Sequence, residues 1–492
     1  MSSSPRVERA EVLPSAVTLS RQKDGVWTPD SVTLKQRSDL LADIAKFARA
    51  NKTIRAFDLR GLHLSADLVL ALSAYATQLS MLRVADCGDL QVSTLSPLLI
   101  CNVGSRSLRV LDLSLSNAGG QRIDSLFTTL SACCPALVEL RVSRGEEGGS
   151  YDDGVEGRSF YGEEDEHGGG GQTLWRTSVS AVRSVLRHCP GLSILGLEGM
   201  RFVEGDDEES SKADDDKNDD KKKKDHLRLH GVSLINCEYS LSFIELILTS
   251  HHLSYLEIVN AARRDYNDDP EEEVAPAVTP CAAELIDVVA TIAGHSMKSL
   301  ALTGFGVRDH DVLAISKGLA HLTRLSLGDS PLLLGKRSFD YLKTSGLLQK
   351  LNRLDLLSDN SDSAFKRSSA SMKLEPGKVS GIGDEAIECF DDSNDLRELM
   401  ICGIDVTPAV IARKLPHLID LSVADCAAFL SPSEVCKLCR ANENVVISEG
   451  DRRACSLGAF GQTFFDCYDE FGEVLLENGL NDFFDEDQKE AK

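Results

Sequence analysis

LRVLDLSLSNAGGQRIDSLFTTLSACCPALVELRV, residues 108–142, holds two copies of one short pattern. The pattern is L-x-x-L-x-L, in which valine, isoleucine or methionine can replace leucine, and it begins at Leu108 and again at Leu137. The two starting points are 29 residues apart (137 − 108). An interval of about 20–29 residues is typical of repeats that each contain one strand and one helix.

The same pattern recurs along most of the chain. Further copies begin at Ile54, Leu79, Leu192, Leu229, Leu253, Met297, Leu322, Leu351, Leu396 and Leu418, and a weaker copy begins at Asn442. No single repeat can bury its apolar face alone, so neighbouring repeats must stack. The sequence therefore predicts an α/β leucine-rich-repeat solenoid of about 12–13 repeats, with a curved parallel sheet on its concave face and helices on its convex face.

Helices are predicted between the strands, because apolar residues there are spaced by three and four. The clearest of these segments are 178–192, 241–253, 309–322 and 408–418. Pro190 and Pro416 follow two of the apolar runs, and a residue without an N–H group is expected to end a helix. Each repeat is therefore expected to contain a strand, a turn and a helix.

The predicted solenoid covers residues 51–448 and is interrupted by polar insertions, which are expected to be disordered because they lack apolar periodicity. The insertions lie at 144–174, 204–225, 262–280 and 358–380. Residues 1–50 are expected to form an N-terminal segment with a capping helix over 38–51. Residues 449–492 are rich in aromatic and acidic side chains, and we expect them to form a C-terminal cap and an acidic tail.

Three strand ends resemble the cysteine-containing leucine-rich repeat of the ribonuclease-inhibitor-like type. They are LRVADC at Leu82–Cys87, VSLINC at Val232–Cys237 and LSVADC at Leu421–Cys426. The resemblance implies that each thiol is buried and bonds the turn after its strand. Repeats of this type are common in F-box proteins, where they hold a substrate for ubiquitination. In this sequence only Leu13-Pro14 resembles the start of an F-box. The alternative function is therefore substrate recognition in an SCF-like ubiquitin-ligase complex, and the partner would then be the adaptor of that complex.

Strand alternation points the third and fifth residues of each pattern out of the concave face. The charged and aromatic residues at these positions form the predicted partner-binding surface: Asp58, Arg83, Asp112, Glu139, Arg141, Tyr255, Glu257, Arg324, Arg353, Asp355, Glu398 and Asp420. Strands about 4.8 Å apart give this surface a length on the order of 60 Å, enough for a protein partner. We therefore expect a non-catalytic protein–protein interaction scaffold or adaptor.

The net charge of −24 favours a protein partner with a basic surface and disfavours nucleic acid. No stretch approaches the roughly 18 apolar residues that span a bilayer, so no membrane association is expected. The start MSSSPRVERAEV has no apolar signal region, which predicts a cytoplasmic protein. Lys221–Lys224 leaves nuclear import open as an alternative.

No nucleophile, base and orienting residue occur at a supporting spacing, so neither an enzyme nor a cofactor is expected. Cys436 and Cys439 form a lone C-x-x-C without a second close pair, so no metal site is expected either. One enzyme-related alternative is a resemblance to the Ran-type GTPase-activating proteins, which are acidic leucine-rich-repeat proteins with an arginine on an early repeat. Arg60 and Arg83 would be the candidates here.

Overall fold

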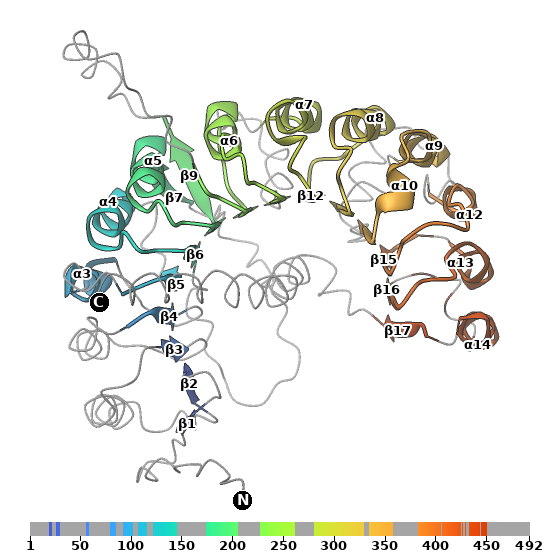
Figure 1. Ribbon diagram of the computed structural model, residues 1–492, viewed down its shortest axis with the longest axis horizontal. Helices are drawn as coiled ribbons and strands as arrows, with labels where there is room; N and C mark the ends of the chain where they lie inside the picture. Colours follow the sequence, from blue (N-terminus) through green and yellow to red (C-terminus); the bar gives the residue numbers. More distant parts are fainter. Residues whose placement is uncertain are drawn as a thin grey trace, which may run out of the picture. The chain divides into compact units, whose positions relative to one another are not determined.

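The structure is a computed structural model, and it describes residues 19–21, 26–29, 56–58, 79–84, 92–101, 107–115, 122–144, 174–204, 227–260, 280–328, 334–357, 382–404, 406–424, 426, 429, 432–442 and 444–449. The chain divides into two compact units. Unit 1 is Met1–Leu253 with Glu273–Pro280, and unit 2 is Ser254–Glu272 with Cys281–Lys492. Each unit has strands along one side and helices along the other (Figure 1).

In unit 1 the main sheet follows the order of the chain, apart from a detour through two further strands. Its strands are β1 (Leu19–Arg21), β2 (Val26–Pro29), β3 (Ala56–Asp58), β4 (Met81–Val84), β5 (Val110–Leu115), β6 (Glu139–Arg144), β8 (Ile194–Glu198) and β10 (Gly231–Ile235). The pair β1–β2 is antiparallel, and the pairs that follow are parallel. The helices are α3 (Val92–Cys101), α4 (Asp124–Cys133), α5 (Val179–His188) and α6 (Leu241–Leu248).

In unit 2 each strand pairs in parallel with the next one along the chain. The strands are β11 (Tyr255–Val259), β12 (Ser299–Thr303), β13 (Arg324–Gly328), β14 (Arg353–Leu357), β15 (Glu398–Cys402), β16 (Asp420–Ala424) and β17 (Val446–Glu449). The helices are α7 (Ala282–Ala293), α8 (Asp309–Gly318), α9 (Lys336–Thr344), α10 (Leu347–Lys350), α12 (Asp384–Ile387), α13 (Pro408–Lys414) and α14 (Pro432–Ala441).

The core of unit 2 is a row of leucines held in register across the sheet. Leu300, Leu325 and Leu354 pair across β12, β13 and β14, and each is at most 1% exposed. The core is completed by buried apolar side chains of the helices, such as Val312 and Ile315 of α8. Because side chains alternate between the faces of a strand, the same register places every second residue on the opposite face. The leucine-rich-repeat fold class predicted from the sequence is confirmed.

Aspartates tie successive helices together. Asp384, the first residue of α12, accepts hydrogen bonds from Thr407 N (2.7 Å) and Thr407 Oγ1 (2.9 Å) at the start of α13. Asp124 of α4 accepts from Ser178 N (2.7 Å) at the start of α5, and Asp309 of α8 accepts from Gly335 N (3.1 Å) at the start of α9. Each carboxylate accepts a hydrogen bond from an N–H group at the start of the next helix, and that N–H group has no hydrogen-bond partner inside its own helix.

Two short strands of unit 1 were not predicted from the sequence. β7 (Trp175–Ser178) and β9 (Met200–Val203) pair in parallel as a second, separate sheet. Gly199, with φ of +67°, turns the chain from β8 directly into β9. Each strand has only four residues, so its alternation is too short to stand out from the polar insertion beside it.

The expected elements are found wherever the described residues include them. The predicted helices at 178–192, 241–253, 309–322 and 408–418 correspond to α5, α6, α8 and α13, which are shorter at one or both ends. The antiparallel pair β1–β2 lies in the N-terminal segment, for which only a helix was expected. The capping helix over 38–51, most of each insertion and the C-terminal cap fall outside the described residues.

Replacing Leu325 by alanine should lower the free energy of unfolding by about 3 kcal/mol, because a fully buried leucine leaves a cavity under the sheet. Ile419→Ala is the matched control, since Ile419 is 48% exposed in the same unit and should cost about 0.5 kcal/mol or less. Urea unfolding followed by circular dichroism measures both. Equal losses in the two variants would contradict the register described above.

Replacing Asp384 by alanine should lower the unfolding free energy by about 1 kcal/mol, because the N–H group of Thr407 loses its acceptor. Asp287→Ala on α7 is the control, because Asp287 is exposed and lies inside its helix. Thermal unfolding of both variants checks the prediction, which requires that only Asp384→Ala lowers the midpoint.

Candidate functional site

The predicted binding residues of unit 1 form a row that alternates in sign. Asp58, Arg83, Asp112 and Arg141 occupy equivalent positions on β3, β4, β5 and β6. Neighbouring strands are about 4.8 Å apart, so Arg83, Asp112 and Arg141 alternate in sign at close spacing along the row.

Arg141 continues this pattern within its own strand. Its Nε lies 2.8 Å from Glu139 Oε1, and both side chains are less than a tenth exposed. On the next strand Gly196 leaves room for this arginine, because a Cβ at Gly196 would lie 3.3 Å from Arg141 Cγ. Three of the predicted contact residues (Asp112, Glu139 and Arg141) are therefore buried rather than presented to solvent.

In unit 2 the corresponding centre is Arg353. Its Nε donates to both carboxylate oxygens of Asp355 (3.1 and 3.0 Å), and its Nη1 donates to Glu398 Oε2 (3.0 Å). Asp355 is buried, and this burial raises the pKa of its carboxyl while the adjacent guanidinium acts to lower it. One positive charge, on Arg353, therefore has two acids as partners, so negative charge is in excess among these three residues.

That excess lies toward the last strands. Glu398 and Asp420 face each other across β15 and β16, so two like charges occupy neighbouring positions. Partial burial raises the pKa of the Asp420 carboxyl, and the negative charge of Glu398 raises it further, against the effect of Arg353. The Glu398 side chain is 42% exposed and Asp420 is exposed, so both acids are accessible.

Two exposed apolar residues adjoin Asp420, one across the sheet and one along the chain. Val446 pairs with Asp420 in register and is 63% exposed, and its N–H group donates to the carbonyl of Ile419 (2.7 Å). Ile419 precedes Asp420 in the chain and is 48% exposed. We call Glu398, Ile419, Asp420 and Val446 the acidic–apolar patch. Ile419 and Val446 were missed by the sequence reasoning, which considered only charged and aromatic positions.

The remaining predicted residues lie in two rows of unit 2, one that contains Arg353 and one that contains Asp355. Tyr255 and Arg324 are half-buried and share a row with Arg353, separated by Ser299. Glu257 shares a row with Asp355 and is fully buried. The structure therefore places all of the predicted residues on strands, but only part of the set is accessible. Their role in binding stays a prediction.

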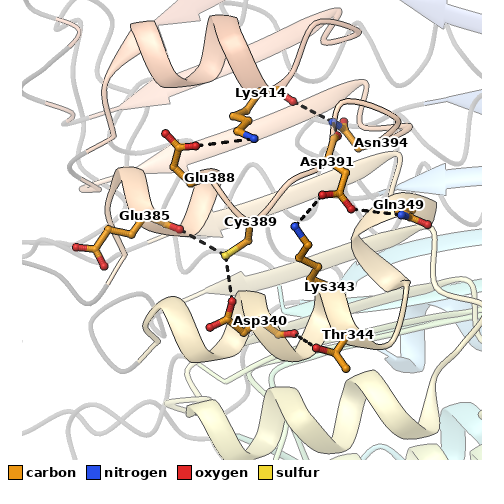
Figure 2. A network of polar contacts seen from close by, with 10 residues as sticks. All are labelled: Asp340, Lys343, Thr344, Gln349, Glu385, Glu388, Cys389, Asp391, Asn394 and Lys414. Carbon is orange, nitrogen blue, oxygen red and sulfur yellow. Dashed lines mark hydrogen bonds and ion pairs between the residues drawn. The ribbon is translucent and has the colours of Figure 1, made fainter.

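A second polar network joins three repeats of unit 2 on the helix side (Figure 2). Lys343 of α9 donates to Asp391 Oδ1 (2.7 Å), and Asn394 Nδ2 donates to the carbonyl of Lys414 (3.0 Å). Lys343 lowers the pKa of Asp391, and burial raises the pKa of the Cys389 thiol. Because Asp391 already has Lys343 as its cationic partner, we interpret the network as structural.

The buried thiols are also structural in character. Cys237 donates to the carbonyl of Leu197 (3.3 Å), and Cys426 donates to that of Ile401 (3.8 Å), whereas Cys87 lies outside the described residues. Burial raises the pKa of Cys189 and of Cys237 to about 12, so both thiols stay protonated and unreactive at neutral pH.

Within the described residues no cluster of histidine, cysteine and acidic side chains is arranged to hold a metal ion. Likewise, none of the helices in this part of the chain is long and apolar enough to cross a bilayer. Arg60, a candidate of the GTPase-activating alternative, lies outside the described residues, whereas Arg83 stands in the alternating row of unit 1.

No protein-family model matches the sequence, and no curated protein matches it. Two solved structures with a similar fold are an internalin (InlF) from Listeria monocytogenes and the Rad7 and Elc1 complex in yeast. The first shares 13% identity with a TM-score of 0.35 and covers 83% of this chain and 95% of its own. The second shares 15% identity with a TM-score of 0.38 and covers 85% and 93%, respectively. Similarity at this level assigns neither a partner nor an activity.

Replacing Arg353 by methionine should lower the unfolding free energy at pH 7 by about 3 kcal/mol, because the buried Asp355 loses its counter-ion. A carboxyl whose pKa is raised in the folded state destabilises the folded protein when it is ionised. This loss of stability disappears as the pH falls through the raised pKa. The loss should therefore be smaller at pH 5 than at pH 7.

The double variant Arg353→Met, Asp355→Leu is the control for this prediction. It removes both charges and should recover most of the lost stability. Urea unfolding of the three proteins at both pH values measures the effect. A single variant as stable as the wild type would show that the ion pair does not matter for folding.

Proposed function

We propose that this chain is a non-catalytic adaptor that binds a protein partner through the strand face of unit 2. The observation that supports this most directly is the acidic–apolar patch. Two accessible carboxylates of like charge stand in register, and two exposed aliphatic side chains adjoin them. A soluble domain gains nothing in the free state from this combination, whereas a partner can neutralise the acids and cover the apolar surface.

The partner that fits this patch presents a basic side chain next to an apolar one. A lysine or arginine between Glu398 and Asp420 would replace the unfavourable like-charge contact by two favourable ones. An apolar side chain over Ile419 and Val446 would bury their exposed surface. Strands about 4.8 Å apart place both contacts within reach of one short segment.

The proposed binding surface is smaller than the surface predicted from the sequence. Arg141 and Arg353 are buried in ion pairs, so reversing their charge tests folding rather than binding. Glu398 and Asp420 are accessible, so their reversal leaves the buried residues in place, although Glu398 loses its hydrogen bond from Arg353. Substrate recognition in a ubiquitin-ligase complex would be one use of such an adaptor and would need the same surface.

The full chain, immobilised at low salt, should retain a specific partner from extracts of its native cell. The double variant Glu398→Lys, Asp420→Lys should bind that purified partner at least about ten-fold more weakly, since each contact would become repulsive. Asp392→Lys is the matched control, because Asp392 is exposed in the same unit outside the patch. Binding of the purified partner is then measured by calorimetry at two salt concentrations.

The proposal predicts that wild type and Asp392→Lys bind alike and that only the patch variant loses affinity. A partner that binds all three proteins equally would place its interface elsewhere and overturn the assignment. Circular dichroism of the patch variant verifies that it remains folded.

A further inference from the structure

The second sheet of unit 1 carries a row of three arginines. Arg122 forms a parallel bridge with Arg176, Arg176 pairs with Arg201 in the register of β7 and β9, and Arg201 bridges to Glu238. Residues paired in this way lie on the same face of a sheet, at steps of about 4.8 Å. We call Arg122, Arg176 and Arg201 the arginine ladder.

The two faces of this sheet differ sharply. Trp175, Thr177 and Phe202 are buried on one face, and Phe202 stacks on Phe243 of α6 with ring centroids 4.0 Å apart. On the other face Arg176 is exposed, and the Arg122 side chain is 64% exposed. The ladder is therefore held on a rigid, well-packed support and faces outward.

The end arginines have carboxylate partners among the described residues. Arg122 Nε lies 3.2 Å from Asp124, and Arg201 Nη2 donates to Glu238 Oε1 (3.0 Å). Among the described residues no carboxylate forms an ion pair with Arg176. The ladder thus holds three positive and two negative charges, a local excess of one positive charge in a chain of net charge −24.

Two described acids near the ladder accept hydrogen bonds from other groups. Glu204, which follows β9, accepts a hydrogen bond from the Ser242 hydroxyl, and that bond lowers the pKa of its carboxyl. Asp124 already accepts from Ser178 N at the start of α5. Val203, two residues after Arg201 and therefore on the same face, is 37% exposed and adds an apolar contact beside the ladder.

We propose that the arginine ladder binds an acidic peptide segment of a partner protein, with one carboxylate at Arg176 and an apolar side chain near Val203. Acidic residues at alternate positions of an extended segment are about 6.8 Å apart, so two or three of them span the ladder, whose length is about 10 Å. Nucleic acid is the less suitable polyanion, because its long charged backbone would be repelled by the net charge of the chain.

Recognition occurs through side chains rather than by addition of a strand. One edge of the small sheet is closed by the bond from Ile123 N to Arg176 O (3.0 Å), and the other by the bond from Phe202 N to Glu238 O (2.9 Å). The backbone at Arg176 and Phe202 is therefore already paired, and the charges of the ladder select the ligand. This site lies in unit 1 and has the opposite charge preference to the acidic–apolar patch, so it does not depend on the proposed function.

The test uses the full chain and a fluorescein-labelled peptide of six glutamates, with binding followed by fluorescence anisotropy. Arg176→Glu should weaken binding at least ten-fold, whereas Arg228→Glu should change it by less than two-fold. Arg228 is the matched control, because it is exposed in the same unit outside the ladder. Glutamate at position 176 would stand between two arginines, so the variant should melt no lower than the wild type. A purely structural Arg176 would give the opposite stability result.

Four outcomes overturn the proposal. Equal binding by wild type and Arg176→Glu would place the peptide elsewhere, and equal losses in Arg176→Glu and Arg228→Glu would indicate nonspecific attraction. The third outcome concerns the acidic residues 206–209 of the chain itself, which are tested by changing them to asparagine and glutamine. If the peptide binds only after this change, the chain's own acids occupy the ladder instead of a partner. Absence of binding to every protein would likewise reject the site.

Discussion

The register between adjacent strands is the constraint on which the rest of this structure depends. A repeat exposes an apolar strand face and an apolar helix face, and it buries them only against the next repeat. Leu300, Leu325 and Leu354 show the result, since they align at equivalent positions and lose almost all contact with water. A shift of one residue would exchange this buried row with the polar row beside it, so the hydrophobic effect fixes the register strongly.

Register has a second consequence, because it also aligns the outward side chains in rows about 4.8 Å apart. At that distance the order of charges along a row decides what the row can do. In unit 1 Arg141 pairs with Glu139, and in unit 2 Arg353 pairs with Asp355, so these charges are satisfied within the chain. Like charges in register leave an excess of one sign, which a partner of opposite charge can neutralise. Glu398 with Asp420 and the arginine ladder both have this property.

The two rows with an excess of charge, Glu398 with Asp420 and the arginine ladder, have similar surroundings despite their opposite signs. Each lies on a rigid sheet whose other face is packed, and each has exposed aliphatic side chains beside it: Ile419 and Val446 in one case, Val203 in the other. Charge gives such a surface its selectivity, and the apolar contact supplies affinity that salt does not screen. An adaptor with two such surfaces can distinguish a basic from an acidic segment without any catalytic group.

The sequence alone determined the repeat, because L-x-x-L-x-L at regular intervals reports directly on burial, which is a local property of each strand. It also predicted the charged positions to lie on strands, where the structure has them. Only the tertiary structure decided which of them are accessible: Glu257 and Asp355 are buried, whereas Asp420 is exposed. Accessibility and charge pairing depend on the neighbours in register, which are about 20 residues or more away in the chain. The arginine ladder was invisible for the same reason, since Arg122, Arg176 and Arg201 meet only across strands.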